Sequence, residues 1–247
     1  VARIGNDAFL GCEGLPSGRV RYGGLQEQWD RIEIGSGNDA LLAAEFYIGE
    51  GSCGEGLSWI LKLDGELRVS GTGDMGDAAA EAGPWYTYRG LVRTATLEPG
   101  VTGIGSYTFA NCVSMESIII PETVTTIHEA AFQNCIALKE VMIPSQVTAI
   151  PESAFQSCAS LMQIELPDQV EEIGSYAFAD CISAETVTLG RSLDRIGNEA
   201  FLGCRSVASF ITDEENMKYY SEDGVLFERL GENGDVRLLA YPAGKTD

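Results

Sequence analysis

The sequence predicts a β-rich repeat solenoid, in which short parallel strands and helical segments of one or two turns stack from one repeat to the next. Three observations carry this prediction. Phenylalanines recur every 23 residues, a cysteine follows each of them three positions later, and the apolar residues in between keep one spacing. A unit this small cannot bury its apolar side alone, so consecutive units must stack. The paired positions are Phe109 and Cys112, Phe132 and Cys135, Phe155 and Cys158, Phe178 and Cys181, and Phe201 and Cys204.

Each element follows from the order of residues within one repeat. The spacing Leu138-x-x-Val141-x-Ile143 ends in alternation, which is typical of a short strand with one buried face. A proline then ends this strand, since proline cannot donate to a β-ladder. Val147 and Ile150 begin a second extended piece, and Glu152 to Cys158 has the apolar spacing of one or two helical turns.

Composition limits the classes of protein that the chain can represent. The 247 residues include 37 acidic and 16 basic side chains, for a net charge of −21. Nucleic-acid binding needs clustered lysine and arginine, so this balance argues against it. No run of about 18 apolar residues occurs, so we expect no membrane insertion in this segment. At 45% hydrophobic residues, the chain has enough apolar material for a packed core.

The repeat resembles a known family. The start of the strand matches the Leu-x-x-Leu-x-Leu signature of leucine-rich repeats, but proline and Val-x-x-Ile replace the asparagine or cysteine that usually follows. With its Ala-Phe-x-x-Cys ending, the unit resembles the BspA-like leucine-rich repeat of bacterial surface proteins. This resemblance implies a secreted or cell-surface, non-catalytic module that adheres to host extracellular proteins or to proteins on other microbes.

The pattern divides the chain into four regions. Residues 1–44 resemble the end of a preceding repeat array with a closing unit, since 1–12 match 193–204 almost letter for letter. Residues 45–91 resemble a small β module, with a hairpin at Asp64-Gly65. Residues 92–212 form a five-unit array, and 213–247 supply a second hairpin joined through 231–234. We expect the natural protein to continue at both ends.

Several motifs invite a chemical role that we weigh against a structural one. Gly71 to Gly76 fits a dinucleotide pattern, but no helix of sufficient length follows. Stacking should place five of the seven cysteines in one buried, reduced column, so Cys53 is the thiol most able to react, although a core role is favoured for it too. His128 is the only histidine. We therefore predict no catalytic residue, no cofactor and no metal site, with weak calcium binding at loop acids as the alternative.

Strand residues that point away from the core form the candidate partner-binding surface. In a stacked array these residues line one face of the sheet, and repeat proteins use such faces for binding. Ile119 and Met142 should lie side by side there as a small apolar patch. A solvated sheet face without a partner is the alternative. The candidate residues are Glu116, Ser117, Ile119, Lys139, Glu140, Met142, Met162, Gln163, Glu165, Glu185, Thr186 and Thr188.

Two other functions remain open from the sequence. The chain could be a spacer that presents a separate domain outside this fragment. It could also be a hydrolase that acts through a carboxylate pair, although acidic pairs such as Glu171 and Glu172 are too numerous to single one out.

Overall fold

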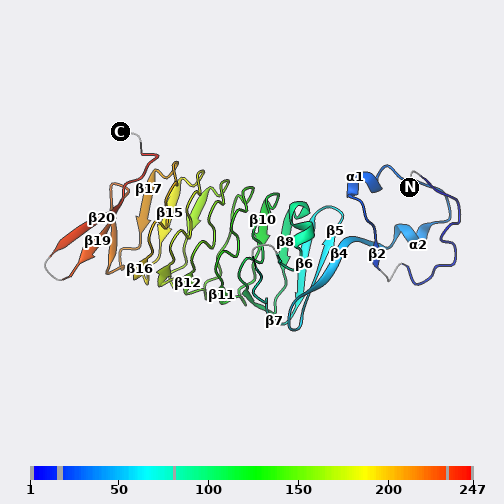
Figure 1. Ribbon diagram of the computed structural model, residues 1–247, viewed down its shortest axis with the longest axis horizontal. Coiled ribbons are helices and arrows are strands. Elements are labelled where there is room, and N and C mark those ends of the chain that lie inside the picture. The colour runs from blue at the N-terminus through cyan, green and yellow to red at the C-terminus, as the bar shows by residue number, and fades with distance from the viewer. Residues whose placement is uncertain (1–2, 16–18, 80–81, 232–233, 246–247) are drawn as a thin grey trace.

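The protein is an elongated solenoid with smaller β-rich sections at its two ends. A computed structural model describes residues 3–15, 19–79, 82–231 and 234–245. In Figure 1 the coils of the central array stack side by side along the long axis, with the N-terminal section at one end and a hairpin at the other. The prediction of a leucine-rich-repeat solenoid with antiparallel hairpins is confirmed.

A buried asparagine holds the N-terminal section together. The elements are β1 (Arg3–Ile4), β2 (Arg19–Arg21), α1 (Gln26–Trp29), β3 (Glu33–Ile34) and α2 (Asp39–Leu42), and β1 pairs with β3 in parallel. Asn38 donates to the carbonyls of Gly5 and Gly35, both at 2.8 Å, and accepts a hydrogen bond from the Phe9 N–H at 3.0 Å. The bonds to Gly5 and Phe9 join segments that are 29 to 33 residues apart in the sequence.

The hairpin predicted at Asp64-Gly65 is present and continues the sheet of the array. Strands β4 (Glu45–Gly54), β5 (Leu57–Lys62) and β6 (Glu66–Gly71) are antiparallel, and β6 pairs in parallel with β8 (Thr94–Leu97). The short β7 (Gly73–Asp74) and the 3₁₀ helix η1 (Tyr86–Leu91) lead into the repeats. Gly65 needs its positive φ of 90°, and a Cβ there would lie 2.7 Å from the Leu91 carbonyl.

Two rows of parallel strands run through the array. The first row contains β8, β10 (Ser117–Ile119), β13 (Gln163–Glu165), β15 (Thr186–Leu189) and β17 (Ser209–Thr212). The second contains β9 (Val101–Ile104), β11 (Thr126–Ile127), β12 (Ala149–Ile150), β14 (Glu172–Ile173) and β16 (Arg195–Ile196). Within these rows, paired strands of neighbouring units align residues 23 positions apart, such as Ile164 with Val187. Stacking therefore keeps the sequence period.

Both rows are interrupted in the middle of the array. In the first row, residues 141–143 belong to no strand, and a single bridge joins Ser117 to Glu140. In the second row, β11 pairs with β9 and β12 pairs with β14, but β11 and β12 do not pair with each other, because Pro151 has no N–H to donate. At the equivalent positions the N–H groups of His128, Gly174 and Gly197 donate to the preceding repeat at 2.7–2.9 Å.

Consecutive turns take the place of the helical segments that the sequence predicts within the repeats. Along the described part of the array the Ala-Phe-x-x-Cys segments form turns, and two residues in each repeat have φ near +60°, such as Ser153 and Ser157. A left-handed residue breaks the helical hydrogen-bond series. The N–H of Phe155, between them, instead donates to the carbonyl of Ala177 in the next repeat at 2.8 Å. These bonds between repeats replace those of a helix.

Stacked phenylalanine rings form the centre of the core. Successive ring centroids from Phe109 to Phe201 lie 5.0–5.8 Å apart, with planes within 7° of parallel. Trp85 covers the first ring at 4.9 Å, and Phe210 covers the last at 5.6 Å. Beside this stack, the thiols of the four later ladder cysteines each donate to the phenylalanine carbonyl of the preceding repeat at 3.2–3.3 Å. The predicted column of reduced, buried cysteines is therefore part of the core.

The C-terminal sheet contains β18 (Tyr219–Glu222), β19 (Val225–Leu230) and β20 (Asp235–Ala240), all antiparallel. The predicted connection through 231–234 includes residues 232–233, which lie outside the described residues. Asn216, which is buried, connects this sheet to the array through four hydrogen bonds: its Nδ2 donates to the carbonyls of Gly190 and Leu193, and its Oδ1 accepts from the N–H groups of Lys218 and Tyr219. No helix in the described residues is long and apolar enough to cross a membrane.

Candidate protein-interaction surface

The first row of strands directs the predicted surface residues to solvent. Nine of the twelve candidates are exposed, and Ser117, Thr186 and Thr188 are half-buried. The alternation of the strands explains this placement, since Ile118 and Val187 between them are buried in the core. We call the surface formed by these twelve residues the sheet face.

Two of the three exposed apolar residues of the sheet face, Ile119 and Met142, share one line of positions, and Met162 lies on another. The bridge between Ser117 and Glu140 sets a register that places Ile119 and Met142 at equivalent positions of neighbouring repeats. Their side chains are 64% and 84% exposed. The same line continues through Glu165 and Thr188 to Ile211, which is 48% exposed. The sequence analysis missed Ile211, although its position in the repeat could have identified it.

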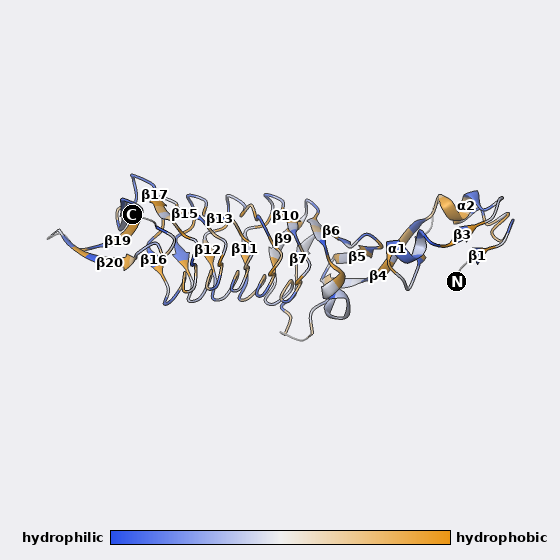
Figure 2. Cartoon of the chain, turned by 90° about the horizontal axis from the view of Figure 1, so that it is seen from above, coloured by the Kyte–Doolittle hydropathy of each residue, from blue (hydrophilic) through white to orange (hydrophobic). Residues whose placement is uncertain are grey.

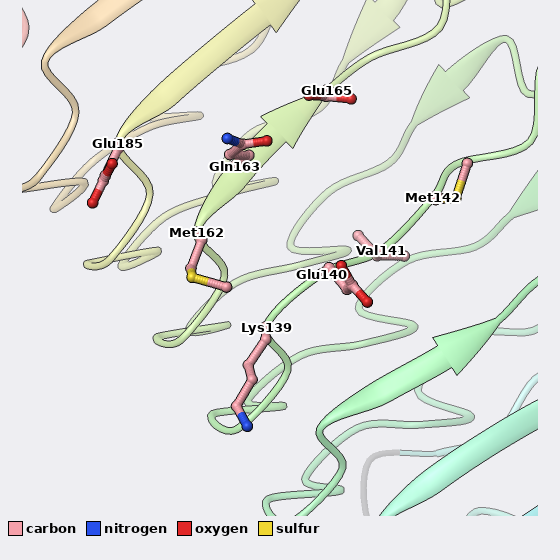
Figure 3. Close-up of a pocket in the computed structure, with 8 residues that line it drawn as sticks. All are labelled: Lys139, Glu140, Val141, Met142, Met162, Gln163, Glu165 and Glu185. Carbon is pink, nitrogen blue, oxygen red and sulfur yellow. The ribbon is translucent and has the colours of Figure 1, made fainter.

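A shallow depression of about 340 Å³ lies where the first row is interrupted. Residues from three successive repeats line it, and the half-buried Val141, whose segment belongs to no strand, is one of them. Figure 3 shows the side chain of Lys139 directed away from Gln163 and Glu165. Seven of the twelve predicted residues line this depression: Lys139, Glu140, Met142, Met162, Gln163, Glu165 and Glu185.

The charges of the depression are unbalanced. Its only basic residue is Lys139, whose Nζ lies 2.5 Å from an oxygen of Glu116 in the preceding repeat. This hydrogen bond holds the pKa of Glu116 below its ordinary value. Within the described chain, Glu140, Glu165 and Glu185 form no ion pair. The depression therefore presents three glutamates and two methionines to solvent.

The structure corrects the expectation about the most reactive cysteine. Cys53 is buried at 4% exposure, and loss of hydration raises the pKa of its thiol to about 12. Burial likewise raises the pKa of Cys112 and of Cys158 to about 12. Cys12 is the exposed cysteine. The core role favoured for Cys53 agrees with its position.

The glycine-rich motif and the single histidine contact neighbouring parts of the fold. Gly71 and Gly73 pack closely on the β4–β5 connection, where a Cβ would lie 2.1 Å from the Gly56 carbonyl and 2.6 Å from the Glu55 carbonyl, respectively. Nδ1 of His128 lies 2.9 Å from Oδ1 of Asp77, which connects the array to the loop before η1. Among the described residues, no three histidine, cysteine or acidic side chains group in a way that could hold a metal ion.

A family model decides what kind of repeat this is. The model of the BspA type leucine rich repeat region matches residues 88–222 with six copies. The chain belongs to this family. BspA-type repeats thus account for the solenoid, and leucine-rich repeats generally mediate protein–protein interaction. No curated protein matches the chain.

Solved structures share this fold. A leucine-rich repeat protein from Eubacterium ventriosum is 24% identical with a TM-score of 0.69, over 81% of this chain and 52% of that protein. A leucine-rich cell surface protein from Faecalibacterium prausnitzii is 22% identical with a TM-score of 0.54, over 81% and 63%. A leucine-rich repeat protein of T. pallidum is 23% identical with a TM-score of 0.52, over 65% and 81%. The chain thus spans about half to two thirds of the first two proteins.

Proposed function

We propose that this chain is a non-catalytic, adhesive protein-interaction module of a larger bacterial protein that is secreted or held at the cell surface. The observation that carries the proposal is the sheet face, where two exposed methionines line a depression and the exposed Ile119 lies in register with one of them. The similarity to a cell surface protein of Faecalibacterium prausnitzii supports the extracellular location.

Binding through the sheet face would draw on many modest contacts. The twelve residues extend over four repeats, and Ile119 and Met142 supply an apolar contact in the first two of them. Interfaces of this kind concentrate affinity in a few well-packed side chains and use the others to exclude water. The packed core holds the backbone of the sheet face in place, so little backbone order has to be gained on binding.

A paired set of variants tests this surface. The protein is applied to immobilised extracellular-matrix extract and to bacterial surface extract, and retention is measured for the wild type and for Ile119→Lys combined with Met142→Lys. We expect retention to fall at least about tenfold in the double variant, which corresponds to about 1.4 kcal/mol. The melting temperature should stay within a few degrees of the wild type, because both side chains are exposed.

The matched control adds the same charges beside the second row of strands, through Thr125→Lys combined with Thr148→Lys, two exposed positions. This control should retain wild-type binding. Equal retention of all three proteins would refute the sheet face as the binding surface. If neither extract retains any of the three proteins, a spacer role is favoured. Turnover in glycosidase or protease assays would favour a hydrolase.

A further inference from the structure

The depression repeats one chemical pair in two places. Met142 and Glu165 occupy the same position in neighbouring repeats, and so do Met162 and Glu185. The second pair is directly linked, since the Glu185 N–H donates to the Met162 carbonyl at 2.9 Å. Each methionine is exposed, at 84% and 52% respectively. The sheet face therefore offers an apolar side chain beside a free carboxylate twice.

The preceding repeat shows how a cation fits such a position. Glu116, Lys139 and Met162 occupy the same position in three successive repeats. The ammonium group of Lys139 lies 2.5 Å from a carboxylate oxygen of Glu116 in the preceding repeat. No lysine or arginine of the described chain pairs with Glu140, Glu165 or Glu185 in this way. A cation at these glutamates would have to come from another molecule.

Lysine and arginine side chains match both parts of the pair. Their aliphatic stems pack on apolar surfaces while the charged ends remain near water and carboxylates. Resting on the proposed interaction function, we propose that the depression binds an exposed segment of the partner protein that carries lysine or arginine, with the stems on Met142 and Met162 and the charged ends at Glu140, Glu165 and Glu185. The net charge of −21 would also steer such a segment toward the protein.

The test uses defined peptides and the whole chain. A fluorescent peptide that alternates lysine with leucine is titrated and followed by anisotropy, beside peptides with glutamine or glutamate in place of lysine. We expect the lysine peptide to bind, the other two to bind at least about tenfold more weakly, and the affinity of the lysine peptide to fall as salt is raised.

Two sets of variants separate a specific site from general attraction to an acidic protein. Glu140→Gln, Glu165→Gln and Glu185→Gln together should weaken peptide binding about tenfold, since they remove three exposed ion pairs of modest strength. Glu13→Gln, Glu171→Gln and Glu214→Gln remove the same charge from exposed positions outside the depression and should leave binding unchanged. Equal weakening by both sets would overturn the proposal.

A gain of affinity gives a second, independent readout. Lys139→Met would free Glu116 and create a third methionine beside a carboxylate, with the carboxylate in the preceding repeat rather than in the following one as for Met162 and Glu185. We expect it to raise affinity for the lysine peptide about threefold, and unchanged or weaker binding would contradict the proposal. If the peptide fails while the Ile119 and Met142 variant still loses binding to the extracts, the cationic partner is wrong and the interaction function remains supported.

Discussion

The stack of phenylalanine rings makes the replacement Phe155→Ala a stringent test of the architecture. Phe155 is fully buried, with ring centroids of Phe132 at 5.0 Å and of Phe178 at 5.3 Å. Replacing a buried phenylalanine with alanine costs about 3–5 kcal/mol through lost burial and a cavity. Loss of two stacking partners, at about 0.5–1.5 kcal/mol each, places this residue in the upper part of that range. We expect a loss of about 4–5 kcal/mol.

Urea unfolding followed by far-UV circular dichroism measures this loss, and Phe201→Ala is the control. Phe201 is half-buried at the end of the stack, with one parallel neighbour at 5.8 Å. It should cost about half as much as Phe155, because less of its surface is buried. Because repeats contact only their neighbours, the transition for Phe155→Ala should also broaden. Equal losses for the two variants, or a loss below about 1 kcal/mol for Phe155→Ala, would refute the stacked-core reasoning.

Three further outcomes follow from buried or paired groups. A thiol reagent at pH 8 should label Cys12 rapidly in the native protein and leave the six buried cysteines, Cys53 included, unlabelled until denaturant is added. Rapid labelling of two or more cysteines per native molecule would contradict this burial. Asn216→Ala should destabilise the protein by about 2–4 kcal/mol, since it leaves buried backbone groups unpaired; urea unfolding measures this, and an unchanged midpoint would exclude that role. The hydrogen bond from Lys62 lowers the pKa of Glu66, so the stabilisation from this ion pair is present above the ordinary glutamate pKa and is lost as the pH falls through the lowered value. Glu66→Gln should therefore cost about 1 kcal/mol of stability at pH 7 and nothing once the glutamate is protonated. Unfolding at a series of pH values will test this.

The sequence predicts the central architecture because a single 23-residue period determines the arrangement of the repeats. The 23-residue interval between Phe132 and Phe155 becomes a ring-to-ring distance of 5.0 Å. Equal spacing in sequence gives equal positions in stacked coils, so the buried residues, the outward residues and the order of the strands follow together. The same logic places Ile119 beside Met142 and identifies most residues of the depression.

The local backbone could not be predicted in the same way. Residues such as Tyr107 and Ser153 adopt φ near +56°, a conformation that their side chains do not favour. Their N–H groups donate to carbonyls 22 residues further along the chain, so the turns depend on contacts between repeats. The apolar spacing of a helix is compatible with these turns too, and a single repeat contains no signal that separates them.

The interruption of the sheet also lies beyond the reach of the repeat pattern. Val141 and Ile143 match their equivalents in the other repeats, yet residues 141–143 form no strand. Pro151, by contrast, is visible in the sequence and explains the missing pairing in the second row. Proline at one position in one repeat signals a local break that an average over repeats would hide.

Because the core repeats so closely, the departures from repetition are where function can reside. The stacked rings and the hydrogen bonds between repeats hold each coil at nearly the same spacing, whatever side chains point outward. Substitutions on the sheet face therefore change the chemistry presented to a partner with little effect on stability. The change from Lys139 to Met162 at one repeated position removes an internal cation and leaves Glu185 unpaired. On this reasoning, specificity in such arrays is encoded at outward positions where one repeat lacks the internal ion pair of its neighbour.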